Sequence, residues 1–212
     1  MKFSGIIIVA VVIVLVGIGF YSMTSGSSDA EYIAEVLSER KQKDKFMRTS
    51  AESPFATRDS VGSESLKPFD GLKYFEPEVK YRIRATLVPI ENKKVVNLTT
   101  SSGEQNRFLE YGWAEFELTG IKTRLLLLEV MAMGPTRGSL FLAFADETSA
   151  KETYGAGRYI DIKKIPGASS MVLDFNNAYN PYCAYTDGYS CPFPPGKNIL
   201  KVAIKAGEKS YH

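Results

Sequence analysis

The sequence predicts a mainly β fold: an antiparallel β-sandwich or barrel with one N-terminal amphipathic helix, preceded by a transmembrane helix. Several segments alternate apolar and polar residues with period two, which is typical of strands with one wet face. Turn-forming residues separate eight short candidate strands. No helical pattern among them is long enough for the crossovers that parallel strands need, so antiparallel pairing is expected.

Composition narrows the function classes. The chain has 212 residues, of which 44% are hydrophobic, and a net charge of +2, so neither intrinsic disorder nor a nucleic-acid partner is expected. Its one histidine is His212, the last residue. Mechanisms that depend on a placed imidazole, such as Ser-His-Asp triads and zinc sites with His ligands, therefore lose their usual group.

The first apolar segment has the length of a membrane helix. Residues 3–23 carry no charge, and about 20 apolar residues span a bilayer core. Lys2 precedes this run and Asp29 is the first charge after it, which favours a cytoplasmic N-terminus. We expect a single-pass anchor and linker over 1–28 and one β-rich extracytoplasmic domain over 29–212. Cleavage as a signal peptide stays open as an alternative.

A helix is expected after the linker, extending to Arg48. Ser28 or Asp29 can cap it. Its apolar residues recur at three- to four-residue spacing and are Tyr32, Ile33, Val36, Leu37, Phe46 and Met47. Its five acidic and five basic residues cancel, so we expect its apolar stripe to cover an open face of the domain, not to bind lipid. Residues 49–77 are rich in Ser, Pro and Gly and predict an irregular surface wrap.

The candidate strands follow this wrap. They are Tyr81–Leu87, Val95–Thr99, Ala114–Leu118, Leu125–Met133 (interrupted by Glu129), Leu140–Ala145, Tyr159–Lys163, Met171–Phe175 and Ile199–Lys205. The longer apolar runs favour central strands over helices, because they are too short for buried helices.

Both cysteines lie in an aromatic stretch, Asp174–Pro195. Thr186-Asp187-Gly188 suits a three-residue hairpin loop with Gly188 in the left-handed conformation. That loop would set Cys183 opposite Cys191, and an even Cys count in an exported chain predicts a disulfide between them.

The same stretch supplies the candidate ligand-binding residues. Tyrosine rings are platforms for sugars and other flat ligands, and the alternative is that they seal one end of a barrel. The candidates are Tyr154, Arg158, Asn176, Tyr179, Asn180, Tyr182 and Tyr185. Asp174, Asn176 and Asn180 do not complete a calcium-loop signature, because Ala178 and Tyr179 stand where an oxygen ligand and glycine are needed. No metal and no cofactor are expected.

A glycine-rich turn precedes Arg158. Gly155 and Gly157 lack the third glycine and the following helix of a dinucleotide site. Arg158 can grip a carboxylate or phosphate, or pair internally with Asp161, Asp174 or Glu208. If the protein is an enzyme, the candidate catalytic residues are Glu152, Arg158, Asp174 and Glu208.

Several ordered motifs resemble the Domain of Unknown Function 1684 family over about residues 41–209. They are KDKFMRTSAESPF, FDGLKYFEPEVKYRI, LFLAFADETSAKETYGAGRYID, LDFNNAYNPYCAYTDGYSCPFPP and IKAGEK. The resemblance implies one domain and no activity. Ala156 stands where a glycine is expected, which indicates that the turn tolerates a side chain.

Three functional hypotheses follow. The first is a non-catalytic binding module for an envelope component, such as a glycan, or for a small ligand. The second is an enzyme acting on a small anionic substrate through Arg158 and nearby carboxylates, and the third is a purely structural envelope protein.

Overall fold

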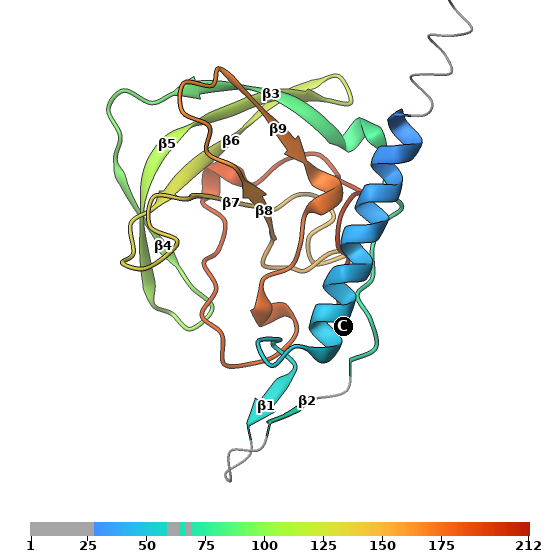
Figure 1. Ribbon diagram of the computed structural model, residues 1–212. Helices are drawn as coiled ribbons and strands as arrows, with labels where there is room; N and C mark the ends of the chain where they lie inside the picture. The colour runs from blue at the N-terminus through green and yellow to red at the C-terminus, as the bar shows by residue number, and fades with distance from the viewer. Residues whose placement is uncertain (1–27, 59–63, 67–68) are drawn as a thin grey trace, which may run out of the picture.

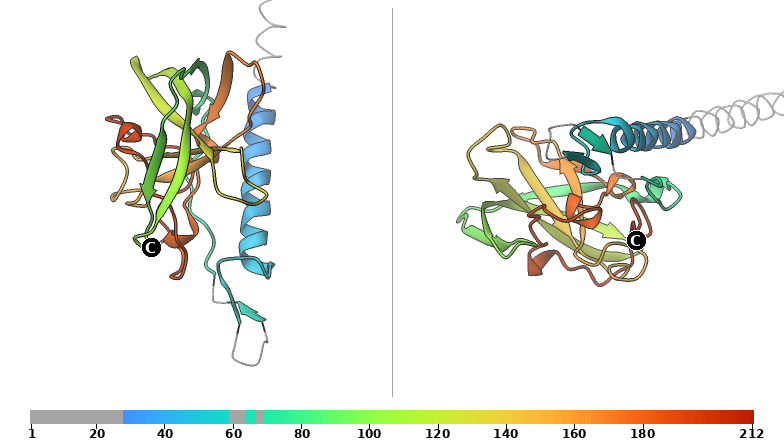
Figure 2. Two further views of the ribbon diagram at one scale, coloured as in Figure 1. Left: turned by 90° about the vertical axis from the view of Figure 1, so that its left-hand side faces the viewer. Right: turned by 90° about the horizontal axis from the view of Figure 1, so that it is seen from below.

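One curled antiparallel sheet of seven strands forms the centre of the protein (Figure 1). The computed structural model describes residues 28–58, 64–66 and 69–212. A helix over residues 28–49 begins and ends close to the expected positions. It lies beside the sheet, and a small two-stranded sheet of β1 and β2 projects beyond its C-terminal end (Figures 1 and 2).

The strands and the 3₁₀ helices follow the helix in chain order. The strands are β1 Ala56–Arg58, β2 Glu64–Leu66, β3 Arg82–Pro89, β4 Val95–Thr99, β5 Gln105–Leu118, β6 Ile121–Val130, β7 Leu140–Phe144, β8 Arg158–Ile162 and β9 Ser170–Asp174. The 3₁₀ helices are η1 Val79–Tyr81, η2 Phe175–Asn177, η3 Tyr182–Ala184 and η4 Gly196–Asn198.

The central position of β6 in the sheet explains its four consecutive leucines, Leu125–Leu128. Leu125 and Leu127 pack in the main hydrophobic core, whereas Leu126 and Leu128 pack in a second cluster with Phe108. Successive side chains of a strand point to opposite faces, so a strand buried on both faces needs apolar residues at every position. The prediction of a central strand here is confirmed.

The expected mainly β, antiparallel fold with one N-terminal helix is confirmed, but the sheet is a half-barrel and neither a sandwich nor a closed barrel. The strand order is β8-β7-β6-β5-β3-β9, with β4 paired to β5 outside this path. The end strands β8 and β9 do not pair with each other, so the barrel stays open. The helix and the chain after β9 cover the open side (Figure 2).

The expected strand Ile199–Lys205 does not form. Only one bridge, between Ala145 and Ile199, connects this segment to the sheet. Its backbone has another use, because the Ile204 carbonyl accepts a hydrogen bond from Arg158. The Asn198 side chain bonds to β6 and β7 instead, at Leu126 N, Leu126 O and Ala143 O.

Strand pairing corrects one further expectation. The expected wrap over 49–77 contains the β1–β2 pair. Among helices formed by the part of the chain that the structure describes, none has the length and apolar character needed to cross a membrane. The anchor expected at 3–23 lies outside the described residues.

Candidate functional site

Arg158, the sharpest candidate in the sequence, is locked inside the protein. Its side chain is 1% exposed, and Nη2 donates to Asp146 Oδ2 at 2.7 Å and to Ile204 O at 3.0 Å. Nη1 donates to the backbone oxygen of Ala206 and, at 3.4 Å, to that of Glu208. Burial lowers the pKa of the Arg158 guanidinium, and the charge of Asp146 acts in the opposite direction. Its carboxylate partner is therefore Asp146 and not Asp161, Asp174 or Glu208, which corrects the internal pairing considered from sequence.

Gly157 shapes the entry of Arg158 into this position. Gly157 has φ +89°, and a Cβ there would lie 2.6 Å from Phe144 O. Only glycine fits such a close approach of two backbones without strain. The glycine-rich turn therefore places the Arg158 guanidinium inside the protein. The neighbouring Ala156 is half-buried, so the turn has room for its methyl group.

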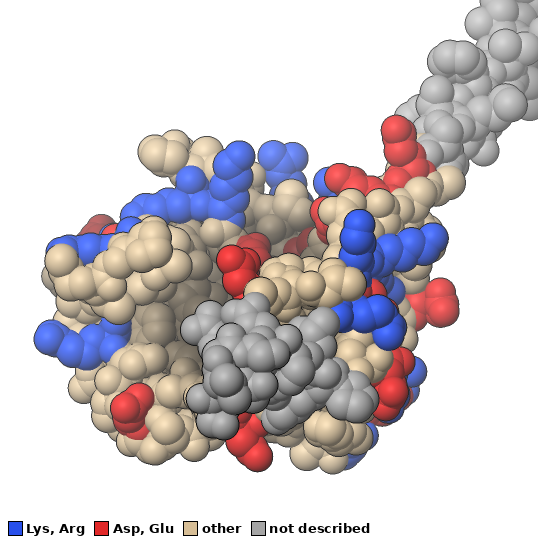
Figure 3. Space-filling view, turned by 60° about the horizontal axis from the view of Figure 1, so that its bottom comes forward, with Lys and Arg blue, Asp and Glu red and all other residues tan. Residues whose placement is uncertain are grey.

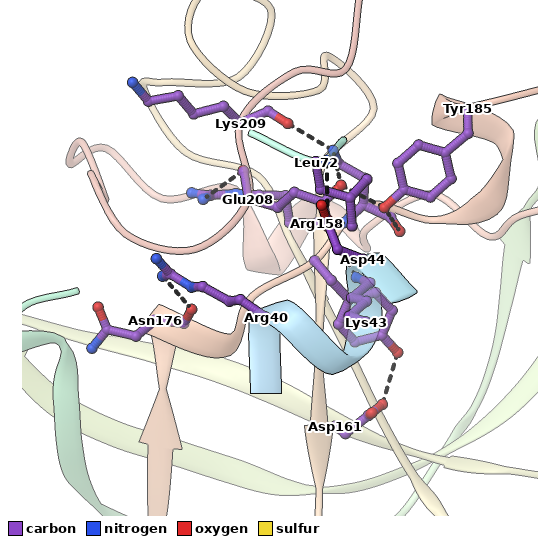
Figure 4. Close-up of polar contacts among 12 residues, drawn as sticks. Arg40, Lys43, Asp44, Leu72, Arg158, Asp161, Asn176, Tyr185, Glu208 and Lys209 are labelled. Atoms are coloured by element: carbon purple, nitrogen blue, oxygen red, sulfur yellow. Dashed lines mark hydrogen bonds and ion pairs between the residues drawn. The ribbon is translucent and has the colours of Figure 1, made fainter. Parts of the chain in front are cut away.

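Glu208 is the centre of a second buried network (Figure 4). It is fully buried, and its carboxylate accepts from Lys43 Nζ at 3.0 Å, Asn180 Nδ2 at 2.9 Å and the Tyr185 hydroxyl at 2.5 Å. Burial raises the pKa of Tyr185, and the charge of Glu208 raises it further. Three donors compensate the buried carboxylate, so its role is to hold the helix and the C-terminal segment together.

A third cluster fixes the first half of the helix. The Tyr32 hydroxyl donates to Asp174 at 2.8 Å, and Asn176 Nδ2 donates to the Tyr32 oxygen at 2.9 Å. Arg40 donates to the carbonyl oxygens of Phe75 at 2.8 Å and Asn176 at 2.9 Å. Asp174 also caps η2 by accepting from Asn176 N, which explains the Asp-Phe-Asn sequence at this point.

A pocket of about 440 Å³ lies where the helix meets the segment after β9. We call it the helix pocket. The helix contributes Glu39, Arg40, Lys43, Phe46 and Met47, and the rest of the protein contributes Tyr74, Asp161, Asn176, Asn177, Ala178, Tyr179 and Tyr182. Acidic and basic side chains are interspersed along the helix on the face shown in Figure 3.

The charged groups of the helix pocket already have partners in the protein. The Tyr179 hydroxyl donates to Asp161 Oδ1 at 2.7 Å, and Lys43 Nζ lies 4.6 Å from the centre of the Tyr179 ring. Asn177 Nδ2 donates to Glu39 at 3.1 Å. Burial raises the pKa of Tyr179, and Asp161 raises it further, so the phenol is neutral at physiological pH. At Tyr179 and Asn177 the pocket is therefore suited to ring contacts and neutral hydrogen bonds.

The structure separates the sequence candidates. Arg158 lies in one buried network, and Asn180, Tyr185 and Glu208 lie in another. Asp174 and Asn176 anchor the helix. Tyr179 and Tyr182 line the helix pocket, whereas Tyr154 lines a different pocket beside Phe55 and Tyr211. Glu152 is exposed and pairs with Lys205 at 3.3 Å.

Sequence reasoning missed four residues of these clusters: Arg40, Lys43, Tyr74 and Asp146. The first two looked like ordinary charges on an amphipathic helix. Asp146 follows β7 and Arg158 begins β8. Because these two strands are antiparallel neighbours, the end of one lies beside the start of the other, and the sequence could have indicated that Asp146 and Arg158 are close. Tyr74 lies in the irregular wrap, where no pattern distinguishes it.

The disulfide between Cys183 and Cys191 is confirmed, but its setting differs from the expected hairpin. Cys183 lies in η3, not in a strand, because Tyr185 N bonds to Tyr182 O and continues the 3₁₀ turn. Gly188 has φ +93°, as expected for the loop. Ser101, in the turn after β4, stabilises this loop, with Oγ donating to Tyr189 O at 3.0 Å and accepting from Cys191 N at 3.1 Å.

Comparison with known proteins places the chain in a family. Residues 67–209 match the model of the family described as "Protein of unknown function (DUF1684)". The chain is a DUF1684 protein. The fold is similar to the solution NMR structure of the uncharacterized protein from gene locus rrnAC0354 of Haloarcula marismortui, with a TM-score of 0.63 and 32% identity. That similarity covers 88% of this chain and 99% of the other. A comparison with curated proteins finds no match.

The DUF1684 motif residues are mostly interior in this chain. Arg158, Asn176, Asn180 and Glu208 are each exposed by 1% or less. In this DUF1684 protein, the polar residues of the motifs therefore hold the helix, the strands and the C-terminal segment together. The residues that contact solvent near them, Tyr179 and Tyr182, belong to the helix pocket.

Proposed function

We propose that this DUF1684 protein is a non-catalytic binding module whose ligand site is the helix pocket. The observation that carries the proposal is the combination of ring faces and polar edges in one pocket. Phe46, Tyr179 and Tyr182 line it together with Asn177 and Asp161. Aromatic faces beside amide and carboxylate groups suit a ligand with a flat, partly apolar ring and hydroxyl groups, such as a sugar.

The enzyme alternative receives no comparable support. Arg158 is sequestered by Asp146 and backbone carbonyls, so its guanidinium has no exposed face for a substrate. Glu208 is fully buried against three donor side chains, and the Glu152 carboxylate pairs with Lys205. A general acid or base must reach the substrate proton within hydrogen-bond distance.

Binding is tested with a panel of monosaccharides and disaccharides by thermal shift and by NMR titration. Tyr182→Ala removes a ring from the pocket and is expected to weaken binding about fivefold, since one stacked ring contributes about 1 kcal/mol. Phe193→Ala is the control, because Phe193 is 39% exposed and lies outside the pocket. Equal losses in both variants, or resonance changes confined to residues away from the pocket, would contradict the proposal.

We also propose that the module is displayed outside the cytoplasm on a single N-terminal membrane helix, facing an envelope component. The apolar run at 3–23 and the disulfide support this, because disulfides persist in oxidising compartments. Protease added to intact spheroplasts should remove a C-terminal tag. A protected tag would show the opposite orientation.

A further inference from the structure

Two side chains of the helix pocket each carry a buried hydrogen-bond donor that lacks an acceptor. These donors are Arg40 Nε and the Tyr74 hydroxyl, and neither has a hydrogen-bond partner among the residues that the structure describes. The Arg40 guanidinium lies 4.5 Å from the centre of the Tyr74 ring, so the two donors belong to adjacent side chains. Buried polar groups are nearly always paired, and an unpaired one is costly. Their acceptor is therefore to be sought in a bound molecule.

Arg40 is also the pocket cation without an ion pair in the described part of the chain. Its two Nη atoms donate to backbone carbonyls, whereas Lys43 pairs with Glu208. Burial lowers the pKa of Arg40, but a guanidinium stays charged in proteins. The exposed Glu39 and Asp161 already accept hydrogen bonds, and solvent screens their charges. The least screened charge of the pocket is therefore positive.

We propose that the helix pocket binds a ring-bearing monocarboxylate, such as a sugar acid, whose carboxylate oxygens accept from Arg40 Nε and the Tyr74 hydroxyl. This inference rests on the proposed function and names its ligand class. Two donors match the two oxygens of one carboxylate, and a guanidinium without an ion pair attracts one negative charge. The ring of the ligand then lies against Tyr179 and Tyr182.

The cleanest test removes one oxygen atom. Tyr74→Phe keeps the ring under Arg40 and deletes a hydroxyl that has no protein partner, so the free protein should be as stable as the wild type. Glucuronate and glucose share a ring and differ by the carboxylate, and benzoate and benzamide make a second matched pair. Full-length nitrogen-15-labelled protein is titrated with each compound and with inorganic phosphate.

We expect both carboxylates to bind at least tenfold more tightly than their neutral partners and to shift the Arg40 Nε–H resonance. Tyr74→Phe should weaken carboxylate binding about tenfold and leave neutral compounds unaffected. The matched control Tyr111→Phe, a half-buried tyrosine outside the pocket, should change neither.

The outcomes separate the two proposals. Neutral and charged partners binding equally, with sensitivity to Tyr182→Ala but not to Tyr74→Phe, would overturn the carboxylate and leave the binding module standing. Preferred binding of phosphate would also overturn it. Arg40 and Tyr74 line a second hollow with Leu72 and Glu76, and carboxylate shifts confined to those residues would overturn the location. No binding by any of these probes would overturn the inference, whereas the saccharide panel decides the proposed function separately.

Discussion

Lys43 Nζ lies 3.0 Å from Glu208 Oε2 and joins the N-terminal helix to the C-terminal segment. Glu208 is the more buried partner, with a side chain 1% exposed against 28% for Lys43. Asn180 and Tyr185 also donate to this carboxylate. The pair therefore couples the docking of the helix to the stability of a buried charge, and Lys43 also lines the helix pocket.

Lys43→Met should destabilise the protein by about 1–3 kcal/mol, because it leaves the buried Glu208 carboxylate without its counter-charge. Lys45→Met is the matched control on the exposed side of the same helix and should change the free energy of unfolding by less than about 0.5 kcal/mol. Urea unfolding of the three proteins measures both values. Equal effects of the two substitutions would mean that the ion pair contributes nothing.

Tyr185→Phe should cost about 1–3 kcal/mol, since its hydroxyl donates to Glu208 at 2.5 Å and the carboxylate would lose that donor. Tyr74→Phe, the same change a short distance away, should be neutral or slightly stabilising in the free protein. Thermal unfolding followed by circular dichroism compares the two. A larger loss for Tyr74→Phe would contradict the hydrogen-bond assignment.

Alkaline pH should reduce the stability difference between wild type and Tyr185→Phe. Burial and Glu208 raise the folded-state pKa of Tyr185 above the ordinary tyrosine value of about 10. The stability that this phenol contributes is fully present below about pH 10 and is lost as the pH rises further, because the unfolded chain then releases the proton first. Urea titrations at pH 8 and above pH 10 measure the difference, and a gap that widens with pH would contradict the sign.

Gly207→Ala should destabilise far more than Gly188→Ala. Both glycines have positive φ, +74° and +93°, so each alanine incurs the left-handed backbone cost of about 1–2 kcal/mol. A Cβ at Gly207 would also lie 2.6 Å from Ala178 O, whereas nothing lies within 4 Å of one at Gly188. Chemical denaturation should give a loss of about 3 kcal/mol or more at Gly207. Similar losses would show that the backbone near Ala178 yields.

Reduction of the Cys183–Cys191 disulfide should lower thermal stability modestly. The cysteines are eight positions apart, and closing so small a loop stabilises by about 2–3 kcal/mol. Thiol reagents should label neither cysteine in the membrane-derived protein until a reductant is added. Free thiols in the native protein would contradict the bond and the oxidising compartment together.

The local sequence pattern predicted most of the strands and the helix, but few of the side-chain contacts between them. The apolar run at Leu125–Leu128 and the alternation at Tyr81–Leu87 are sufficient for strands, because burial on one or both faces determines the residue type at each position. Ile199–Lys205 shows a similar pattern, but the Ile204 carbonyl accepts a hydrogen bond from Arg158. The local sequence does not indicate whether a carbonyl will bond to a neighbouring strand or to a guanidinium. The disulfide was predictable from the cysteine count. The hairpin was not, because residues Tyr182–Ala184 form a 3₁₀ turn where a strand was expected.

Only part of the helix pocket could be predicted, because local sequence does not indicate contacts between distant segments. Tyr179 and Tyr182 were found because aromatic residues are dense in that stretch. Arg40 and Lys43 were not, because the rotation of the helix against the sheet decides which of its charges face inward, and that depends on contacts more than 130 positions away.

The docking of the helix also has a consequence for biosynthesis. Its hydrogen-bond partners Asp174, Asn176 and Glu208 follow Tyr32, Arg40 and Lys43 by 142, 136 and 165 positions. At a synthesis rate of about 5–20 residues per second, the helix emerges roughly ten seconds before the segment that receives it. During that interval the apolar stripe of the helix has no partner surface. A chain that ended at Pro195 would contain the strands β1 to β9 but not Glu208, so Lys43 would lack its partner and the first helix would lack this contact.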